Sequence, residues 1–300
     1  MSRIADSALE PGRRSLAADL AELTKSRITI LVVVTAAAGY LLASGDRSLW
    51  QAHFAWTLLG TALLAAGASA LNQVLERDLD ALMQRTMHRP LPAGRLDPDV
   101  ALGVGAALVV AGLAVLVQTT NLLTAALGAA TVLAYLFLYT PLKRKTSLAT
   151  VVGAVPGAIP PMMGWAAVRD DVAPGAWALF GILFCWQLPH FLAIAWMYRE
   201  DYARGGFPML PVIDSEGRET SRQTVLWSGA LLPVSLLPTV LGLAGEVYFV
   251  GALLLGLAFF AIACAFALTR SHLAARRLLL TSVAYLPALL AVLAIDRLVN

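Results

Sequence analysis

The chain has 300 residues, of which 59% are hydrophobic and 14% are charged, and its mean hydropathy is +0.73. Soluble proteins are about 45–50% apolar and about 25% charged, so this composition excludes an ordinary soluble domain and makes the lipid bilayer the main solvent. The formal net charge of +3 is too small to indicate a nucleic-acid partner, and the two cysteines lie singly in apolar stretches, which excludes a disulfide framework.

Residues 1–26 precede the first long apolar run and predict a cytoplasmic N-terminal tail. The segment has no apolar core of the kind that a signal peptide needs. Asp6, Glu10 and Asp19 also argue against a transit peptide, because such presequences are poor in acidic residues. The remaining residues, 27–300, are expected to form a single transmembrane domain.

Long apolar runs predict an all-α, polytopic membrane protein with about nine transmembrane helices. The runs lie at residues 27–44, 54–72, 100–118, 121–140, 148–168, 175–198, 225–243, 247–269 and 278–296. With nine spans, 19 of the 22 Lys and Arg residues fall on one side of the membrane, and only Arg47, Arg169 and Arg297 fall on the other. The positive-inside rule then predicts a cytoplasmic N-terminus. We expect a multi-pass protein of the bacterial inner (plasma) membrane.

Two connections on the predicted cytoplasmic side are long, at residues 73–99 and 199–224, and both carry acidic residues. Where the first begins, Asn72, Glu76 and Asp80 are spaced i, i+4 and i+8, so on a helix they share one face. Such oxygen ligands suit Mg²⁺, which bridges carboxylates to substrate phosphates. Arg85 and Arg89 follow, and guanidinium groups pair with phosphate. A solvated, charged loop would explain the same residues without any ligand.

The segment Tyr139–Thr146 ends the fourth predicted span and reads YTPLKRKT. Its Lys143 and Arg144 are candidates for a second cationic contact to diphosphate. A basic cluster that merely ends a span would look the same.

The sixth predicted span contains Gln187 and His190, which are polar groups within an apolar helix and therefore candidates for function. Asp201 lies 11 residues after His190, close to three helical turns, so a continuous helix would place both on one face about 16 Å apart. The alternative is that His190 only forms a hydrogen bond between helices.

Four stretches resemble the intramembrane prenyltransferases of the UbiA superfamily. They are NQVLERDLDALMQRTMHRPLPAGR at 72–95, YTPLKRKT at 139–146, PGAIPPMMGW at 156–165 and WQLPHFLAIAWMYREDYARGGFPMLPV at 186–212. The first is shared in outline by the whole superfamily. The last, with its PHF, EDY and PMLP segments, is more specific to the branch that modifies haem.

The resemblance implies nine helices around a central cavity, open to the cytoplasmic side. It implies transfer of farnesyl from farnesyl diphosphate to a vinyl group of haem b, with addition of water, to give haem O and diphosphate. It implies Mg²⁺ as cofactor, and haem A synthase or terminal-oxidase assembly as candidate physical partners.

The resemblance also assigns roles to residues. The catalytic and metal-binding candidates are Asn72, Glu76, Asp80 and Asp201. The substrate-binding candidates are Arg85, Arg89, Lys143, Arg144, Gln187, His190, Glu200, Tyr202 and Arg204, with His190 a candidate to ligate or orient the haem iron. Glu76 stands where the superfamily has Asp, and the second superfamily motif, two aspartates four residues apart, is reduced to Glu200 and Asp201.

Two other functions fit the pattern less well. A prenyltransferase of the same fold acting on an aromatic or quinone precursor would not need the imidazole of His190 at membrane depth. A secondary transporter would favour discontinuous helices and charged residues near the midplane, whereas the carboxylates here gather at one face.

Overall fold

The computed structural model describes residues 15–45 and 51–299, and within these ranges the chain is helical and contains no strand. Arg3, Arg13, Arg14 and Arg47, and most of the predicted tail, lie outside the described residues. The helices are α1 (Leu16–Leu23), α2 (Ser26–Ser44), α3 (Gln51–Asp80), α4 (Pro98–Thr119), α5 (Leu122–Leu133), the π-helix η1 (Ala134–Tyr139), α6 (Thr140–Leu142), α7 (Ala149–Ala158), α8 (Pro160–Arg169), α9 (Pro174–Met197), α10 (Arg199–Arg204), α11 (Leu210–Ile213), α12 (Arg218–Val240), α13 (Glu246–Thr269) and α14 (His272–Val299).

Nine segments of the described chain are long and apolar enough to cross a membrane, which confirms the predicted number of spans. The segments α5, η1 and α6 form one span, and α7 and α8 form the next. At three spans the helix extends beyond the predicted end of the span, into residues that include charged side chains. The second span was predicted to end at residue 72, but α3 continues to Asp80, and α12 and α14 begin at Arg218 and His272 instead of residues 225 and 278. Hydropathy marks where lipid ends, whereas a helix continues into water until its backbone is capped.

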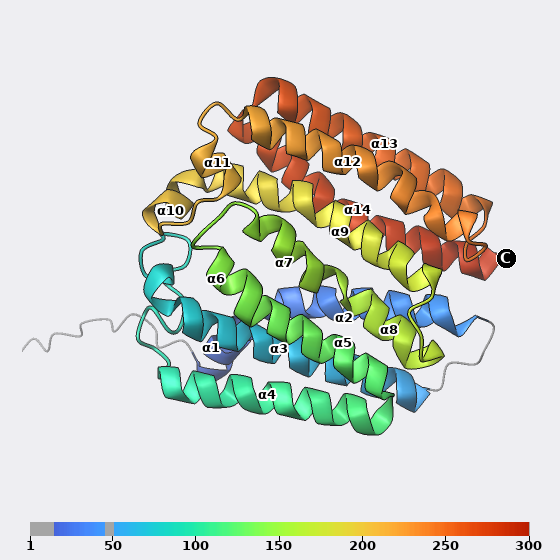
Figure 1. The fold of residues 1–300 in the computed structure, drawn as a ribbon, viewed down its shortest axis with the longest axis horizontal. Helices are drawn as coiled ribbons and strands as arrows, with labels where there is room; N and C mark the ends of the chain where they lie inside the picture. The colour runs from blue at the N-terminus through green and yellow to red at the C-terminus, as the bar shows by residue number, and fades with distance from the viewer. Residues whose placement is uncertain (1–14, 46–50, 300) are drawn as a thin grey trace, which may run out of the picture.

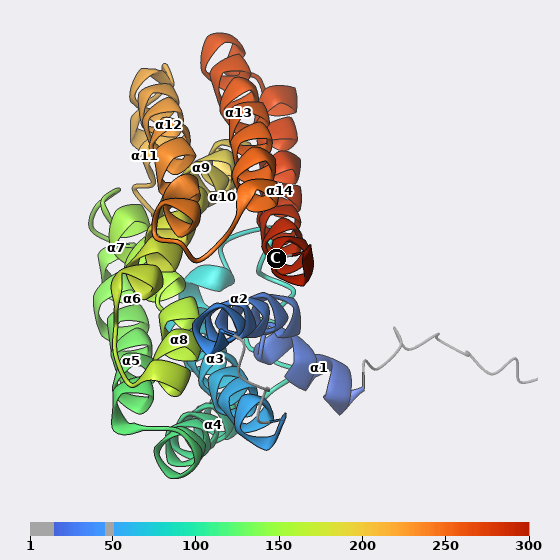
Figure 2. The ribbon, with the colours of Figure 1, turned by 90° about the vertical axis from the view of Figure 1, so that its right-hand side faces the viewer.

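The long helices run antiparallel along one axis (Figure 1). The α3–α4 connection, α10, α11 and the α13–α14 turn lie at one end, which we call the loop end, and the α4–α5, α8–α9 and α12–α13 turns lie at the other (Figure 1). Figure 2, an end-on view, shows that α12, α13 and α14 form a group apart from α3 and α4. The two long connections of the sequence are therefore brought together at the loop end.

Glycines allow the close crossing of α2 with α8. A Cβ atom at Gly39 would lie 1.9 Å from the backbone oxygen of Pro161, and one at Gly164 would lie 1.8 Å from the backbone oxygen of Ala36. Lipid provides no hydrophobic drive for helix association, so such small residues, which let backbones touch, stabilise helix pairs in membranes. Large side chains such as Val110 and Leu254 instead point outward and are more than 60% exposed, as expected of a surface covered by lipid.

Helix α1 packs against the part of α3 that lies near the loop end. Gln73 donates from Nε2 to the backbone oxygens of Glu22 and Leu23, at 2.9 and 2.8 Å. Arg95 forms an ion pair with the buried carboxylate of Asp19 at 2.9 Å. These contacts fix the turn between α1 and α2, and with it Lys25, beside the polar face of α3.

Candidate active site

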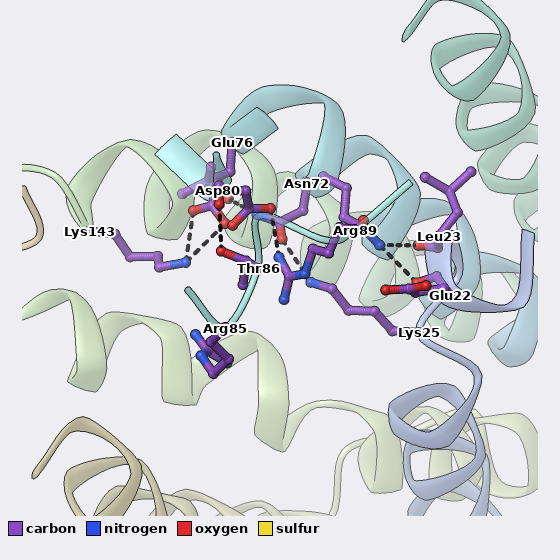
Figure 3. Close-up of polar contacts among 12 residues, drawn as sticks. Glu22, Leu23, Lys25, Asn72, Glu76, Asp80, Arg85, Thr86, Arg89 and Lys143 are labelled. Atoms are coloured by element: carbon purple, nitrogen blue, oxygen red, sulfur yellow. Dashed lines mark hydrogen bonds and ion pairs between the residues drawn. The ribbon is translucent and has the colours of Figure 1, made fainter. Parts of the chain in front are cut away.

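The polar face of α3 carries the three residues predicted to act together. Asn72, Glu76 and Asp80 are 1%, 3% and 1% exposed, and because α3 is helical through Asp80 they do share one face. Figure 3 shows the three side chains directed toward one region near the end of the helix. Buried carboxylates require charged or hydrogen-bonding partners, so the identity of those partners defines the site.

Three cations from three separate segments surround this face. Lys143 contacts both carboxylate oxygens of Glu76, at 2.7 and 3.1 Å. Arg89 forms an ion pair with Asp80 at 2.7 Å, and Lys25 donates to Oδ1 of Asn72 at 3.0 Å (Figure 3). The site thus joins α3 to the α1–α2 turn, the α3–α4 connection and the end of the fourth span.

The π-helix η1 positions the contacts from the fourth span. Tyr135 donates to Oδ1 of Asn72 at 3.3 Å, and Nδ2 of Asn72 donates to Thr140 at 3.1 Å. Lys143 follows directly and lies 5.2 Å from the centre of the Tyr139 ring. Single π-turns within α-helices are frequent at functional sites because they re-aim side chains. Here the π-turn directs several polar groups at α3.

The two lysines are in different electrostatic situations. Burial disfavours the charge of Lys143, but the adjoining Tyr139 and Glu76 outweigh it and raise the pKa of Lys143 above its usual value. Burial, together with the positive charges of Arg89 and Lys143, lowers the pKa of Lys25 to about 7. Among the ion pairs of the described residues none involves Lys25, whose Nζ instead donates to Asn72.

Lys25 is a site residue that the sequence did not reveal, because its spacing does not distinguish it from the other basic residues that precede the first span. Its backbone is left-handed, with φ of 47°, although it is not a glycine. Such conformations cost about 1–3 kcal/mol and persist where the surroundings enforce them. The strain at the start of α2 directs the ammonium group of Lys25 toward Asn72.

The donor set fits Mg²⁺, whose ligands are oxygens and which retains positions for substrate phosphates. Asn72, Glu76 and Asp80 would supply a carboxamide and two carboxylates from one helix face. Within the described ranges no three His, Cys, Asp or Glu side chains gather into a metal site by themselves.

Asp201 has a different set of partners. Its carboxylate accepts from the backbone N–H groups of Gln84 and Arg85, at 2.8 and 3.1 Å, and pairs with Arg204. Burial alone would raise its pKa, but these hydrogen bonds and Arg204 hold the pKa of Asp201 below its usual value. Asp201 thereby attaches the α3–α4 connection to α10, and its predicted metal-binding role stays a prediction.

The other predicted binding residues lie around this connection. Arg85 donates to the Tyr202 hydroxyl at 3.3 Å and stacks on Tyr198 and Tyr202, away from the carboxylates of α3 (Figure 3). Glu200 is exposed, and Arg144 donates to the backbone oxygen of Leu75 at 3.4 Å.

Gln187 and His190 lie deeper in α9. Gln187 donates to the backbone oxygens of Ala154 and Leu183, at 2.9 and 3.1 Å, and a Cβ atom at Gly157 would lie 2.2 Å from its Oε1. These contacts join α7 to α9. His190 is half-buried, stacks on Trp186 and shares a hydrogen bond with Ser282 of α14 at 2.7 Å.

The expectation that one continuous helix carries His190 and Asp201 is wrong. Helix α9 ends at Met197, and Tyr198, with φ of −114° and ψ of 26°, separates it from α10. The bend turns α10 toward the α3–α4 connection, so Asp201 reaches Gln84 and Arg85 instead of extending the face of His190.

Comparison with known proteins identifies the architecture. A model of the UbiA prenyltransferase family matches residues 32–289. A protoheme IX farnesyltransferase of Solibacter usitatus is 48% identical over 287 residues, covering 93% of this chain and 98% of that protein. One of Koribacter versatilis is 44% identical over 298 residues, covering 96% of each.

Solved structures agree on the fold. A digeranylgeranylglyceryl phosphate synthase superimposes with a TM-score of 0.78 at 15% identity, over 95% of this chain and 99% of the other. A UbiA homologue from Archaeoglobus fulgidus bound to GPP and Mg²⁺ superimposes with a TM-score of 0.62 at 16% identity, over 92% of this chain and 99% of the other.

Proposed function

The chain belongs to the UbiA prenyltransferase family, and we propose that it transfers the farnesyl group of farnesyl diphosphate to a vinyl side chain of haem b. Water adds to the resulting cation and a proton is lost, so the product is haem O, and diphosphate is released. The relatives from Solibacter and Koribacter, which carry the name of this activity, are similar over nearly their whole length.

The observation that carries the proposal is the ring of cations around Asn72, Glu76 and Asp80. Transfer begins when the bond between C1 of farnesyl and the diphosphate oxygen breaks, which leaves negative charge on diphosphate. Lys25, Lys143 and Arg89 already converge on one region, and positive groups held in place in this way stabilise negative charge that develops beside them. We assign the diphosphate of the donor to this region.

Mg²⁺, held by the oxygens of Asn72, Glu76 and Asp80, would neutralise diphosphate and so make it a better leaving group. The other task of the protein is to keep water from the allylic cation until the vinyl group has reacted. A bundle whose interior is formed by nine apolar spans suits that task.

His190 is suited to contact the haem iron. Ser282 donates its single hydroxyl proton to the backbone oxygen of Leu279 at 2.6 Å, so it accepts from Nδ1–H of His190. The lone pair of His190 is then on Nε2. Histidines that bind metals are oriented by such a hydrogen bond on the other ring nitrogen. We therefore propose that Nε2 of His190 contacts the iron of haem b, the prenyl acceptor.

We also propose that the loop end faces the cytoplasm of a bacterial inner membrane. The described segments at the loop end carry most of the basic residues, whereas Arg169 and Arg297 lie toward the opposite end. Positive residues are retained on the cytoplasmic side. Farnesyl diphosphate, a charged molecule, would then enter from the compartment in which the site opens.

A reconstituted reaction tests the function. Purified protein is incubated with haem b, farnesyl diphosphate and Mg²⁺, and the pigment is analysed by mass spectrometry. We expect a product heavier than haem b by one farnesyl group plus one hydroxyl group, and none when Mg²⁺ is chelated. A parallel reaction replaces haem by an aromatic quinone precursor. Prenylation of that acceptor, with haem unchanged, would refute the assignment of haem.

His190 is tested separately by titrating haem b into the His190→Ala variant. We expect weaker haem binding and an altered haem spectrum, with the affinity for farnesyl diphosphate unchanged. An unchanged spectrum and affinity, combined with a lower melting temperature, would make His190 a helix-packing residue only.

A further inference from the structure

A second polar region at the loop end lies outside the cluster on α3. A pocket of about 680 Å³ opens between the α3–α4 connection, the end of α9 with α10, and the turn from α13 to α14. Gln84 and Arg85 form one wall, Trp196 to Asp201 another, and Arg270 with His272 a third. Asn72, Glu76 and Asp80 are not among its lining residues, so the pocket is distinct from the cluster on α3, although Asp201, whose metal-binding role stays a prediction, lines it.

The pocket has more positive than negative charge. Arg85, Arg199, Arg204 and Arg270 line it, against the carboxylates of Glu200 and Asp201. The carboxylate of Asp201 already pairs with Arg204 and accepts hydrogen bonds from two backbone N–H groups. The excess is two positive charges, which a ligand with two negative charges would balance.

Two of these arginines have no carboxylate partner in the part of the chain that the structure describes. The guanidinium of Arg199 lies 5.2 Å from the centre of the Trp196 ring, which fixes its position without neutralising it. Arg270 donates from Nη1 to the backbone oxygen of Glu216 at 3.1 Å, which again leaves its charge uncompensated. Both guanidinium groups are held at the pocket and keep donors available.

The backbone of Arg270 supports a ligand-binding role. It ends α13 in a left-handed conformation with φ of 48°, a position at which glycine is usual because a side chain is disfavoured there. An arginine at this position accepts strain that glycine would avoid. The turn alone would favour glycine, so we attribute the arginine at this position to its side chain.

The chemistry of the walls selects the ligand. Guanidinium groups bind carboxylates in bidentate geometry, and Tyr198, which is 39% exposed, offers apolar surface beside them. The proposed acceptor, haem b, has this combination, because its flat apolar macrocycle carries two propionate carboxylates at one edge. His190 lies seven residues before Met197 on the same face of α9, about 10 Å deeper along the helix, and Met197 lines the pocket.

We propose that this pocket, through Arg199 and Arg270, binds the propionate carboxylates of the haem acceptor. The inference rests on the proposed function. It places the acidic edge of the porphyrin at the loop end, where water solvates it, and the opposite part of the macrocycle toward the interior of the bundle. Donor and acceptor would then each present their anionic groups at the loop end, on different sides of the α3–α4 connection.

Haem titrations test the proposal, with Arg199→Gln and Arg270→Gly as the variants. Glycine suits the left-handed backbone at position 270, so this variant removes the guanidinium without adding strain. Arg218→Gln is the matched control, since Arg218 is exposed and does not line the pocket. Each protein is titrated with haem b, with haem b dimethyl ester, in which the propionates carry no charge, and with inorganic diphosphate plus Mg²⁺. Melting temperatures verify folding.

We expect the combined variant to bind haem b about tenfold to a hundredfold more weakly, as for loss of charged hydrogen bonds. Its affinity for the dimethyl ester and for diphosphate should equal that of the unmodified protein. Equal affinity of the unmodified protein for haem b and its ester would overturn the proposal. A combined variant with weaker diphosphate binding and unchanged haem binding would also overturn it. If the unmodified protein makes haem O and the variants bind haem normally, only this pocket is misassigned. If the unmodified protein neither binds nor converts haem, the proposed function fails as well.

Discussion

Replacing Glu76 by glutamine separates the structural from the catalytic role of the α3 cluster. Glu76 and Lys143 lie 2.7 Å apart, and their side chains are only 5% and 14% exposed. Removing one partner of a buried ion pair leaves the other charge uncompensated, which costs about 3–5 kcal/mol. Because Lys143 is close to the loop end and slightly exposed, we expect the lower limit, about 3 kcal/mol of unfolding free energy.

The assay is a double-mutant cycle with Glu76→Gln, Lys143→Met and the combined variant, measured by reversible denaturation in detergent micelles and by haem O formation. The combined variant should recover most of the stability lost by Glu76→Gln, since no buried charge is left unpaired. It should not recover turnover, which we expect to fall at least about a hundredfold in all three, because each lacks the carboxylate proposed to hold Mg²⁺, the ammonium group proposed to face diphosphate, or both.

The exposed pair of Glu216 and Arg218 is the control, and Glu216→Gln should change stability by less than about 1 kcal/mol. Full stability of the single Glu76→Gln variant would refute the reasoning, because it would mean that Lys143 finds water or another partner at no cost. Recovery of turnover in the combined variant would equally refute the assignment of both residues to the diphosphate site.

Three further predictions concern other parts of the molecule. Lys25→Gly removes the ammonium group, and glycine suits the backbone φ of 47° at this position. The KM for farnesyl diphosphate should therefore rise about tenfold to a hundredfold at unchanged melting temperature. An unchanged KM would exclude Lys25 from the site. Gly164→Val should prevent α8 from crossing α2 and abolish stable folding, which is measured as loss of monodisperse protein. Gly103→Ala is the control and should fold normally, because a Cβ atom at position 103 meets no atom within 4 Å. Asp214→Ala removes hydrogen bonds to Thr220 at 2.7 and 2.9 Å and should cost about 1 kcal/mol at pH 7. Burial raises the pKa of Asp214 and these hydrogen bonds lower it, with a net decrease. Its contribution is therefore complete above pH 4 and is lost as pH falls through the folded-state pKa, and a difference in melting temperature that does not shrink as pH falls below 4 would contradict this.

The architecture could be predicted because lipid imposes a simple rule on sequence. A span needs roughly 20 apolar residues, and basic residues mark the retained side, so nine runs and their charged flanks predict nine helices. The ends of the helices could not be predicted in the same way. α3 continues through Glu76 and Asp80 into the polar region, and hydropathy does not register a helix outside lipid.

The site was predicted as far as local spacing allows. The i, i+4, i+8 pattern places Asn72, Glu76 and Asp80 on one face, and this depends only on helix geometry. Their partners depend on tertiary structure. Lys143 reaches Glu76 across 67 residues and Lys25 reaches Asn72 across 47, and no periodicity contains that information. The π-turn before Lys143 is likewise invisible in the sequence.

Backbone strain provides a clue that spacing does not. In the described chain, only Lys25, Asp170 and Arg270 combine positive φ with a residue other than glycine. Two of the three are basic, both lie at helix ends on the loop end, and each lies at one of the two regions that we propose to bind anions. Strained conformations concentrate at functional sites because function, and not stability, retains them. Lys25 belongs to the diphosphate cluster on geometric grounds alone, since its Nζ lies 3.0 Å from Asn72. Arg270 is strained in the same way at the second region, where a carboxylate-bearing acceptor would explain an arginine in place of the glycine that the turn alone would favour.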